Sequence, residues 1–300
     1  MPLTDSYKSI LLDADWGYQK YYGWKSLIER SGLRLFKKNV GPVRRYLVLS
    51  QLNLDQLAIE LTKLHISSPL SIITVKDFSN QHQGCYTELL LDGLHVPQAD
   101  DADRLLNKYT FVVNLNQESD RLWANMHSDN KRVCRKAIAS GMVVESVSSP
   151  PNELLALFFE RYRTMANERS LASLNEKIIN QMFDDGRLRM HYARNANNIC
   201  TIALVYSVAL KSIFLYGVSG DHKNDGSAQL LHWKIIEHLK RAGQHWYDLG
   251  GVPEISDSNG IYRFKRSLGG EGFDLGPEYY YCPGILLVAK RAYKKLRSML

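Results

Sequence analysis

The chain has 300 residues, 45% of them hydrophobic, and this composition excludes an intrinsically disordered protein. Its formal net charge of +7 favours a polyanionic partner such as nucleic acid, a nucleotide or an anionic membrane surface. The four cysteines form neither a CxxC pair nor a metal-binding spacing, which argues against a disulfide scaffold. The first residues lack a signal-peptide pattern, and no apolar run is long enough to span a bilayer, so we expect a cytoplasmic protein.

Residues 1–115 have a mixed helix and strand pattern that predicts a first domain. The aromatic-rich stretch 16–32 is expected to end as a helix that Gly32 closes. Apolar residues at helical spacing predict a helix over 54–64, and we expect 95–104 to be a surface loop. Strands are expected at 44–50, 70–75, 85–91 and 109–115.

Residues 116–282 predict a second domain, in which helices precede an antiparallel meander of three strands. Ser173 and Glu176 have the spacing of a capping box, and Pro151 suits the first turn of a helix. The last turn of the meander is expected at Lys211–Ser212. Helices are expected at 118–126, 130–140, 152–168, 173–183 and 227–242, and strands at 142–147, 188–194, 199–210, 213–219 and 245–249.

The stretch 227–270 carries the most distinctive pattern of the chain. A helix leads into a strand that ends in Asp248 and the pair Gly250–Gly251, and a G-I-x-x-F-K run follows from Gly260 to Lys265. This pattern, after a meander, resembles the FemABX peptidyltransferases and their GNAT-like acyltransferase relatives. The resemblance implies a mixed α/β fold of two tandem GNAT-like domains, each a mixed β-sheet flanked by helices. It is clear over about 116–300, whereas over the first 115 residues it rests on element order and length.

The resemblance places the Phe264–Lys265 pair near the acyl donor. A fixed lysine cation stabilises the oxyanion that forms when an amine attacks an ester or thioester, so Lys265 is the first catalytic candidate. Asp248 could take the proton of the amine or orient the acceptor. The alternatives are a carboxylate that caps the amides near Gly250 and a Phe264 that only packs in the core. We also expect positive φ at Gly251.

A phosphate site is expected where the loop 222–227 opens a helix, because free amides and the helix dipole favour an anion there. Lys223 adds charge, Gly226 allows close backbone approach, and Asp225 or Ser227 can cap the helix. The Arg/Gln-x-x-Gly-x-Gly/Ala signature of GNAT enzymes is absent, so the donor stays open between acyl-CoA and aminoacyl-tRNA. The alternative is an ordinary capped helix.

A basic helix is predicted over 130–140, where Arg132, Arg135 and Lys136 recur at helical spacing. With Ala137 and Gly141 they are similar to an R-x-x-[IV]-R-[KR]-A-x-x-x-G run of FemABX-like proteins. Such a helix could bind a sugar-nucleotide diphosphate or the tRNA backbone. The alternative is a solvated face with Val133, Ala137 and Ile138 packed beneath it.

The tail 283–300 predicts an amphipathic helix with five basic residues and no acidic ones. It could lie on an anionic membrane surface or dock on the fold, where it would pack on the N-terminal domain. The histidines form no metal-ligand set, so we expect no metal. The chain has no nucleophile elbow, Walker loop or dinucleotide fingerprint, which favours direct attack by a bound amine over covalent catalysis.

With these patterns, the resemblance implies an N-acyltransferase or aminoacyltransferase of cell envelope biogenesis. The activated acyl group would come from acyl-CoA or aminoacyl-tRNA. The acceptor would be an amine of a sugar-nucleotide, of a polysaccharide precursor or of a lipid-linked precursor at the inner face of the membrane. The alternative is a non-catalytic RNA- or polymer-binding module built on degenerate GNAT-like domains.

Overall fold

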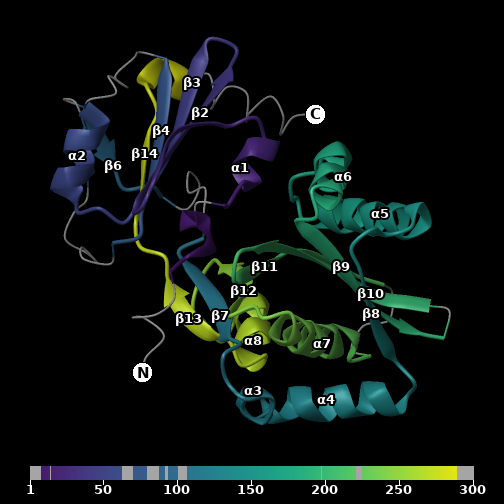
Figure 1. The fold of residues 1–300 in the computed structure, drawn as a ribbon. Coiled ribbons are helices and arrows are strands. Elements are labelled where there is room, and N and C mark those ends of the chain that lie inside the picture. The colour runs from purple at the N-terminus through teal and green to yellow at the C-terminus, as the bar shows by residue number, and fades with distance from the viewer. Residues whose placement is uncertain are drawn as a thin grey trace. The chain divides into compact units, whose positions relative to one another are not determined.

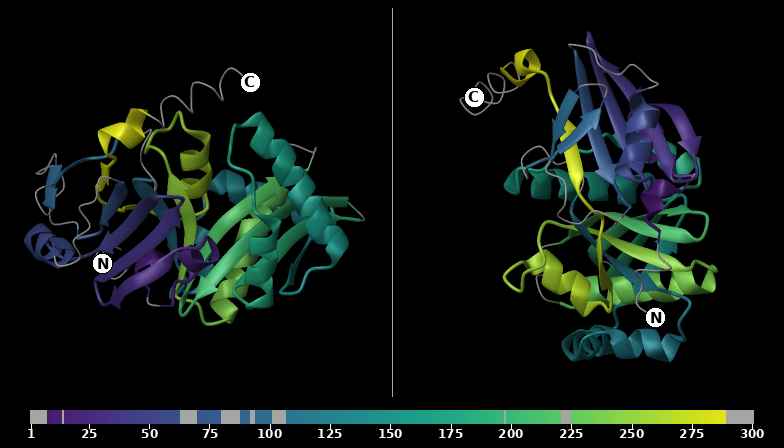
Figure 2. Two further views of the ribbon diagram at one scale, coloured as in Figure 1. Left: turned by 90° about the horizontal axis from the view of Figure 1, so that it is seen from above. Right: turned by 90° about the vertical axis from the view of Figure 1, so that its left-hand side faces the viewer.

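The computed structural model describes residues 8–13, 15–62, 70–79, 88–91, 94–100, 107–196, 198–220 and 225–288. Its contacts divide the chain into two compact units. Residues 1–10 and 110–273 form the large unit, and residues 11–109 and 274–300 form the small unit. Both units are mixed α/β, as predicted (Figures 1 and 2). In the described part of the chain, no helix is long and apolar enough to cross a membrane.

The small unit contains a five-stranded sheet in the order β1-β2-β3-β4-β14. The strands are β1 Lys25–Arg30, β2 Leu33–Val40, β3 Val43–Ser50, β4 Ser71–Asp77 and β14 Glu278–Tyr281. The first three form antiparallel hairpins, and helix α2, Leu54–Thr62, returns the chain so that β4 runs parallel to β3. β14 pairs antiparallel with β4, so segments far apart in sequence complete one sheet (Figure 1). The remaining elements are a 3-10 helix Ile10–Leu12, α1 Tyr18–Tyr21, β5 Glu88–Leu91 and β6 Leu94–Pro97.

The two faces of this sheet are buried by different kinds of side chain. One face presents Leu33, Leu35, Tyr46, Val48, Ile73, Val75 and Tyr279, which pack on Leu57 and Leu61 of α2. These positions alternate along each strand, because successive side chains of a strand point to opposite faces. Arg34, between two core leucines, is 1% exposed, and its guanidinium donates to the carbonyls of Leu11, Asp13 and Trp16 at 3.2, 2.6 and 2.9 Å. Arg34 therefore ties the preceding segment to β2.

Two expectations for this unit were wrong. The stretch 16–32 ends in strand β1 instead of a helix, and Gly32, at φ +76°, forms the turn into β2, a strand that we did not predict. The expected surface loop at 95–104 begins inside strand β6. The strands expected at 44–50 and 70–75 and the helix expected from 54 are confirmed.

The large unit contains a seven-stranded sheet in the order β13-β7-β12-β11-β10-β9-β8. The strands are β7 Tyr109–Asn114, β8 Val143–Val147, β9 Leu188–Asn195, β10 Asn198–Val208, β11 Lys211–Ser219, β12 Trp246–Val252 and β13 Glu271–Asp274. The helices are α3 Ser119–Asn125, α4 Ser128–Ala139, α5 Asn152–Glu168, α6 Glu176–Asp184, α7 Ser227–Arg241 and α8 Gly260–Ser267. Helices α5 and α6 cover one face of the sheet, whereas α7 packs on the other face and α4 packs on α7 (Figures 1 and 2).

Strand β11 has a geometry that positions the site. The antiparallel meander of β9, β10 and β11 is confirmed, and α7 connects β11 to a parallel β12. The parallel ladder between β11 and β12 runs only from Lys211 opposite Trp246 to Ile213 opposite Asp248. By contrast, β3 and β4 of the small unit stay paired from Arg44–Ser71 to Ser50–Asp77. A β-bulge interrupts the β10–β11 ladder where Leu204 and Val205 face Tyr216 and Phe214.

Several local expectations for the large unit need correction. Helix α6 is capped by Asn175, whose side chain accepts from the Ile178 amide at 3.3 Å, so the Ser173–Glu176 capping box is wrong. The last turn of the meander precedes Lys211, with Ala209 at φ +47°. Helix α8 was not predicted, although its cap, Asn259, is a typical N-cap residue.

Candidate functional site

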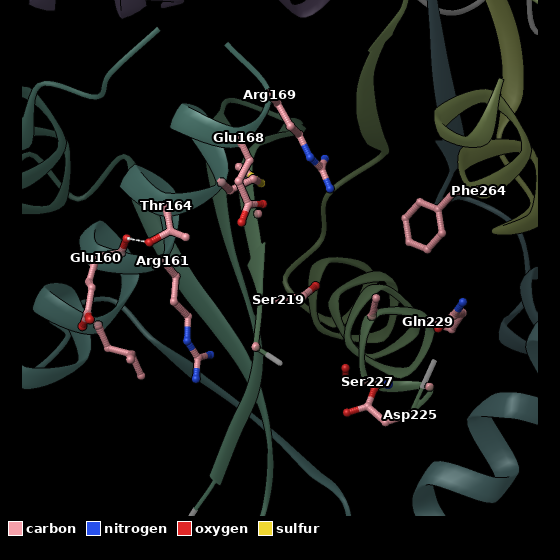
Figure 3. A pocket seen from close by; sticks show the side chains of 16 residues that line it. Glu160, Arg161, Thr164, Glu168, Arg169, Ser219, Asp225, Ser227, Gln229 and Phe264 are labelled. Atoms are coloured by element: carbon pink, nitrogen blue, oxygen red, sulfur yellow. Dashed lines mark hydrogen bonds between the residues drawn. The ribbon is translucent and has the colours of Figure 1, made fainter. Parts of the chain in front are cut away.

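A cavity of about 1090 Å³ opens in the large unit beside the end of β11 (Figure 3). One wall is helix α5 from Leu157 to its C-cap residue Arg169, and the opposite wall is the first turn of α7. The end of β11 and Phe264 of α8 complete the lining. The cavity therefore combines a helix N-terminus, the free end of a strand and an aromatic side chain.

The N-terminus of α7 is one end of this cavity. Gly226 is its N-cap residue with φ +84°, and a side chain there would meet Val133 of α4, with Cβ 2.7 Å from Cγ1. The Asp225 carboxylate accepts from the Ser227 amide at 2.8 Å, and the Ser227 hydroxyl lies 2.6 Å from that of Thr201. Gly226 and Ser227, both predicted, therefore line the cavity, whereas Lys223 lies outside the described residues.

Helix α5 contributes charged side chains that we did not predict. Arg161 and Arg169 lie two turns apart on the cavity wall, and Glu160 and Glu168 form a parallel acidic row beside them (Figure 3). Arg161 donates to the Ile199 carbonyl at 2.8 Å, which fixes its guanidinium beside the end of β11. No motif marks these residues, and the only sequence signal is like charge repeating every eight residues on one helix.

Phe264 lines the other end of the cavity, and further aromatic side chains pack behind it. Phe264 projects into the cavity, and its ring lies 5.5 Å from that of His232 on α7 (Figure 3). His232 is 4% exposed, makes an edge contact with Phe214 at 4.8 Å, and bonds the Tyr247 hydroxyl through Nδ1 at 3.0 Å. Burial, with a smaller effect of the Lys265 charge, lowers the pKa of His232 to about 3, so this histidine is neutral at physiological pH.

Lys265 and Asp248 lie next to this aromatic group but not on the cavity lining. Lys265 is 8% exposed, and its ammonium donates to the Gly251 carbonyl at 2.9 Å. Burial lowers the pKa of Lys265 to about 8, and the nearby Asp248 charge opposes this shift. Asp248 accepts from the Gly250 amide at 2.7 Å and from the Thr110 hydroxyl at 2.5 Å.

These contacts bear on the two alternatives given above for Asp248 and Phe264. Asp248 does cap the turn that follows it, because it binds the Gly250 amide. The positive φ expected at Gly251 occurs instead at Gly250, at +81°, so that expectation was wrong. Phe264 packs on a buried ring and also faces the cavity, so the packing role and the ligand-facing role are compatible.

The basic helix α4 does not reach the cavity lining. Its exposed face contains Arg132, 3.6 Å from Asp129, Arg135, which lies 5.6 Å over the Trp123 ring, and Lys136. Its buried face contains Asn130, Cys134 and Ala137. Ile138, expected to pack beneath the basic residues, is instead 50% exposed.

No protein-family profile matches the sequence, and no curated protein matches it. Among solved structures, FemX aligns with a TM-score of 0.68 at 15% identity, covering 95% of each chain. The C-terminal domain of a lysylphosphatidylglycerol synthetase from Agrobacterium fabrum aligns with a TM-score of 0.56 at 14% identity, covering 94% of this chain and 90% of that one. The chain has a FemABX-like fold.

The tandem nature of this FemABX-like fold is also seen in another structure. A tandem GNAT protein of the clavulanic acid pathway aligns with a TM-score of 0.50 at 12% identity, covering 85% of this chain and 80% of that one. The predicted fold of two tandem GNAT-like domains is thereby confirmed. In the large unit, the cavity brings together three predicted residues, Gly226, Ser227 and Phe264, with Arg161 and Arg169.

Proposed function

We propose that the chain is an acyl or aminoacyl transferase that moves an activated acyl group onto an amine. The observation that carries the proposal is the cavity between α5 and α7, whose ends differ in chemistry. One end offers the amides of the α7 N-terminus, and the facing wall of α5 carries Arg161 and Arg169, which suits the phosphates of a donor. The other end is Phe264, whose chain neighbour Lys265 is a buried cation.

Lys265 is the residue that we propose to stabilise the reaction's negative charge. Attack of the amine nitrogen on the donor carbonyl forms a C–N bond and an oxyanion, and collapse expels a thiolate or a ribose oxygen. The leaving oxygen or sulfur takes up the proton that the amine loses. The Gly251 carbonyl holds this cation in place next to Phe264, which lines the cavity. With a pKa of about 8, Lys265 is largely protonated near neutral pH.

Asp248 fits a positioning role in this scheme. It holds the Gly250 amide and the Thr110 hydroxyl, and so fixes the turn whose Gly251 carbonyl anchors Lys265. Its charge also keeps the pKa of Lys265 from falling further. We therefore propose that Asp248 orients Lys265 rather than taking the proton of the amine.

The donor is proposed to be an acyl-CoA or an aminoacyl-tRNA, and the acceptor an amine of a sugar-nucleotide or envelope precursor. The exposed residues Arg132, Arg135 and Lys136 of α4 are proposed to bind the phosphates of the larger partner. Val133 of this helix packs on Gly226, so α4 lies beside the N-terminus of α7. Cytoplasmic location and contact of residues 283–300 with an anionic membrane are part of this proposal.

The donor can be tested by the thermal-unfolding midpoint at low salt, with CoA thioesters in one series and tRNA in another. A ligand at about a hundred times its dissociation constant adds roughly 2.7 kcal/mol to the stability. A shift with CoA thioesters alone identifies an N-acyltransferase, and a shift with tRNA that fades with salt identifies an aminoacyltransferase. If neither series raises the midpoint, the non-catalytic binding module becomes the better explanation.

The role of Lys265 can be tested with Lys265→Ala and Asp248→Asn once a donor is known. Both variants should keep the fold by circular dichroism and lose turnover. Lys177→Ala, which removes an exposed lysine of α6 in the same unit, is the matched control and should keep the wild-type rate. Full turnover in Lys265→Ala would refute the assigned role.

A further inference from the structure

The rings of Phe214, His232 and Phe264 lie near the point where β11 and β12 stop pairing. Phe214 follows the last paired residue of β11, Ile213, and its carbonyl lies near Gly250 of β12, where an added Cβ would be 3.2 Å away. The strands are therefore still close at Phe214. Beyond it, β11 continues to Ser219 paired with β10 alone. The Phe214 ring thus lies at the vertex between two diverging strands.

The position of the Phe214 ring depends on the absence of a side chain at Gly217. A Cβ added to Gly217 would lie 2.6 Å from Cζ of Phe214, so the ring rests on the bare backbone of Gly217. Gly217 itself lines the cavity. The β-bulge next to Phe214 allows residues 214 and 217 to lie on the same face of the strand, which regular alternation would forbid.

The ring of His232 packs against both Phe214 and Phe264. His232 contacts Phe214 edge-on at 4.8 Å and Phe264 at 5.5 Å, and its own ring is fixed by the hydrogen bond to Tyr247. Because His232 is fully buried in α7 and neutral, it packs as an aromatic spacer. Phe214, His232 and Phe264 therefore form a continuous aromatic wall, of which Phe264 lines the cavity directly and Phe214 rests on Gly217, which also lines it.

We infer that this aromatic wall sets the length of the acyl group, and that Phe214 is a specificity-determining residue. The inference rests on the proposed function. A donor whose phosphate lies at the α7 N-terminus would direct its acyl end toward Phe264, and the wall would stop it there. Short groups such as acetyl or glycyl fit in front of the wall, whereas octanoyl or leucyl groups would require the rings to move.

The test measures binding of two pairs of stable probes by calorimetry. Acetyl-CoA and octanoyl-CoA form one pair, and the 3′-glycylamino and 3′-leucylamino derivatives of adenosine, which mimic the end of a charged tRNA, form the other. In the pair that binds, we expect the short probe to bind the wild type about 10–100-fold more tightly than the long one. In Phe214→Leu the ratio should fall by about 10-fold, because the shorter side chain opens the wall.

Two further variants distinguish an effect of the aromatic wall on probe binding from an effect of lower protein stability. Phe183→Leu makes the same change at a buried site on α6 and should keep the wild-type ratio. Gly217→Ala should displace the Phe214 ring and weaken binding of both probes of a pair. Because the wild-type ratio needs no variant, the test does not depend on the variants folding.

The outcomes distinguish the two levels of the proposal. If none of the four probes binds the wild type, the proposed function fails and this inference fails with it. If short and long probes bind equally well, the wall does not limit the acyl group, although the proposed function stands. A folded Phe214→Leu protein with the wild-type ratio would also overturn the inference.

Discussion

Replacement of Gly226 by alanine tests how the N-terminus of α7 is built. Gly226 has φ +84°, and its Cβ would lie 2.7 Å from Cγ1 and 3.0 Å from the carbonyl oxygen of Val133. The first contact could be relieved by a side-chain shift, but the second is with the backbone of α4. The substitution therefore forces either a change in φ or a displacement of two packed helices.

The expected cost has two parts. An alanine in the left-handed region costs roughly 1–2 kcal/mol relative to glycine. The contact with Val133 adds overpacking, which typically costs about 1–3 kcal/mol. The sum is about 2–5 kcal/mol of unfolding free energy. In a unit of this size each kcal/mol lowers the melting temperature by about 2–4 °C, so a fall of roughly 4–20 °C is expected.

A matched control separates the backbone cost of positive φ from the cost of the contact with Val133. Gly141, after the end of α4, has φ +81°, and no atom lies within 4 Å of an added Cβ. Gly141→Ala should therefore show only the backbone cost of about 1–2 kcal/mol. Urea unfolding of both variants measures the difference. Equal destabilisation by the two substitutions would show that the close packing of Gly226 on Val133 contributes nothing, and would refute the reasoning.

Three further predictions concern charged groups. The pKa of Lys265 is about 8 in the folded state against 10.5 ordinarily, so the unfolded state binds the proton more tightly. The stability of the wild type relative to Lys265→Met should thus rise between pH 8 and pH 10.5, and a pH-independent difference in urea midpoint would contradict this. Thr110→Val should cost about 1.5–3 kcal/mol in urea unfolding, because it removes a hydrogen bond to the buried Asp248 carboxylate, and an unchanged midpoint would contradict that bond. If tRNA binds, Arg132→Ala with Lys136→Ala should reduce the slope of log K against log salt by about 2, and an unchanged slope would exclude α4 from the interface.

The order of elements in the large unit could be predicted from the sequence because its apolar periodicity is strong. The helix from Ser227 and the strand from Trp246 were expected within a residue of their observed starts. The stretch 16–32 was wrongly predicted to end as a helix, because its aromatic residues obscure the alternation of apolar and polar residues in β1. Most side chains of β1 are exposed, as is usual for a strand at the edge of a sheet. Helix α8 was missed because its eight residues are too few to establish a period.

The site could be predicted only where a local motif marks it. Gly226, Ser227 and Phe264 were identified from a helix start and a short motif, and all three line the cavity. Arg161 and Arg169 were missed, because their relation to the cavity depends on how α5 packs against β11. Tertiary packing of this kind leaves no local signal in the sequence.

The pairing of β14 with β4 has a consequence for how the protein is made. The Lys76 ammonium binds the Gly276 carbonyl at 2.8 Å across 200 residues of chain. On a ribosome that adds about 5–20 residues per second, β4 would wait roughly 10–40 s for its partner strand. During that time the nascent small unit has an open sheet edge, which is a site for mispairing. Strands β1 to β4 are thus synthesised long before β14 completes their sheet.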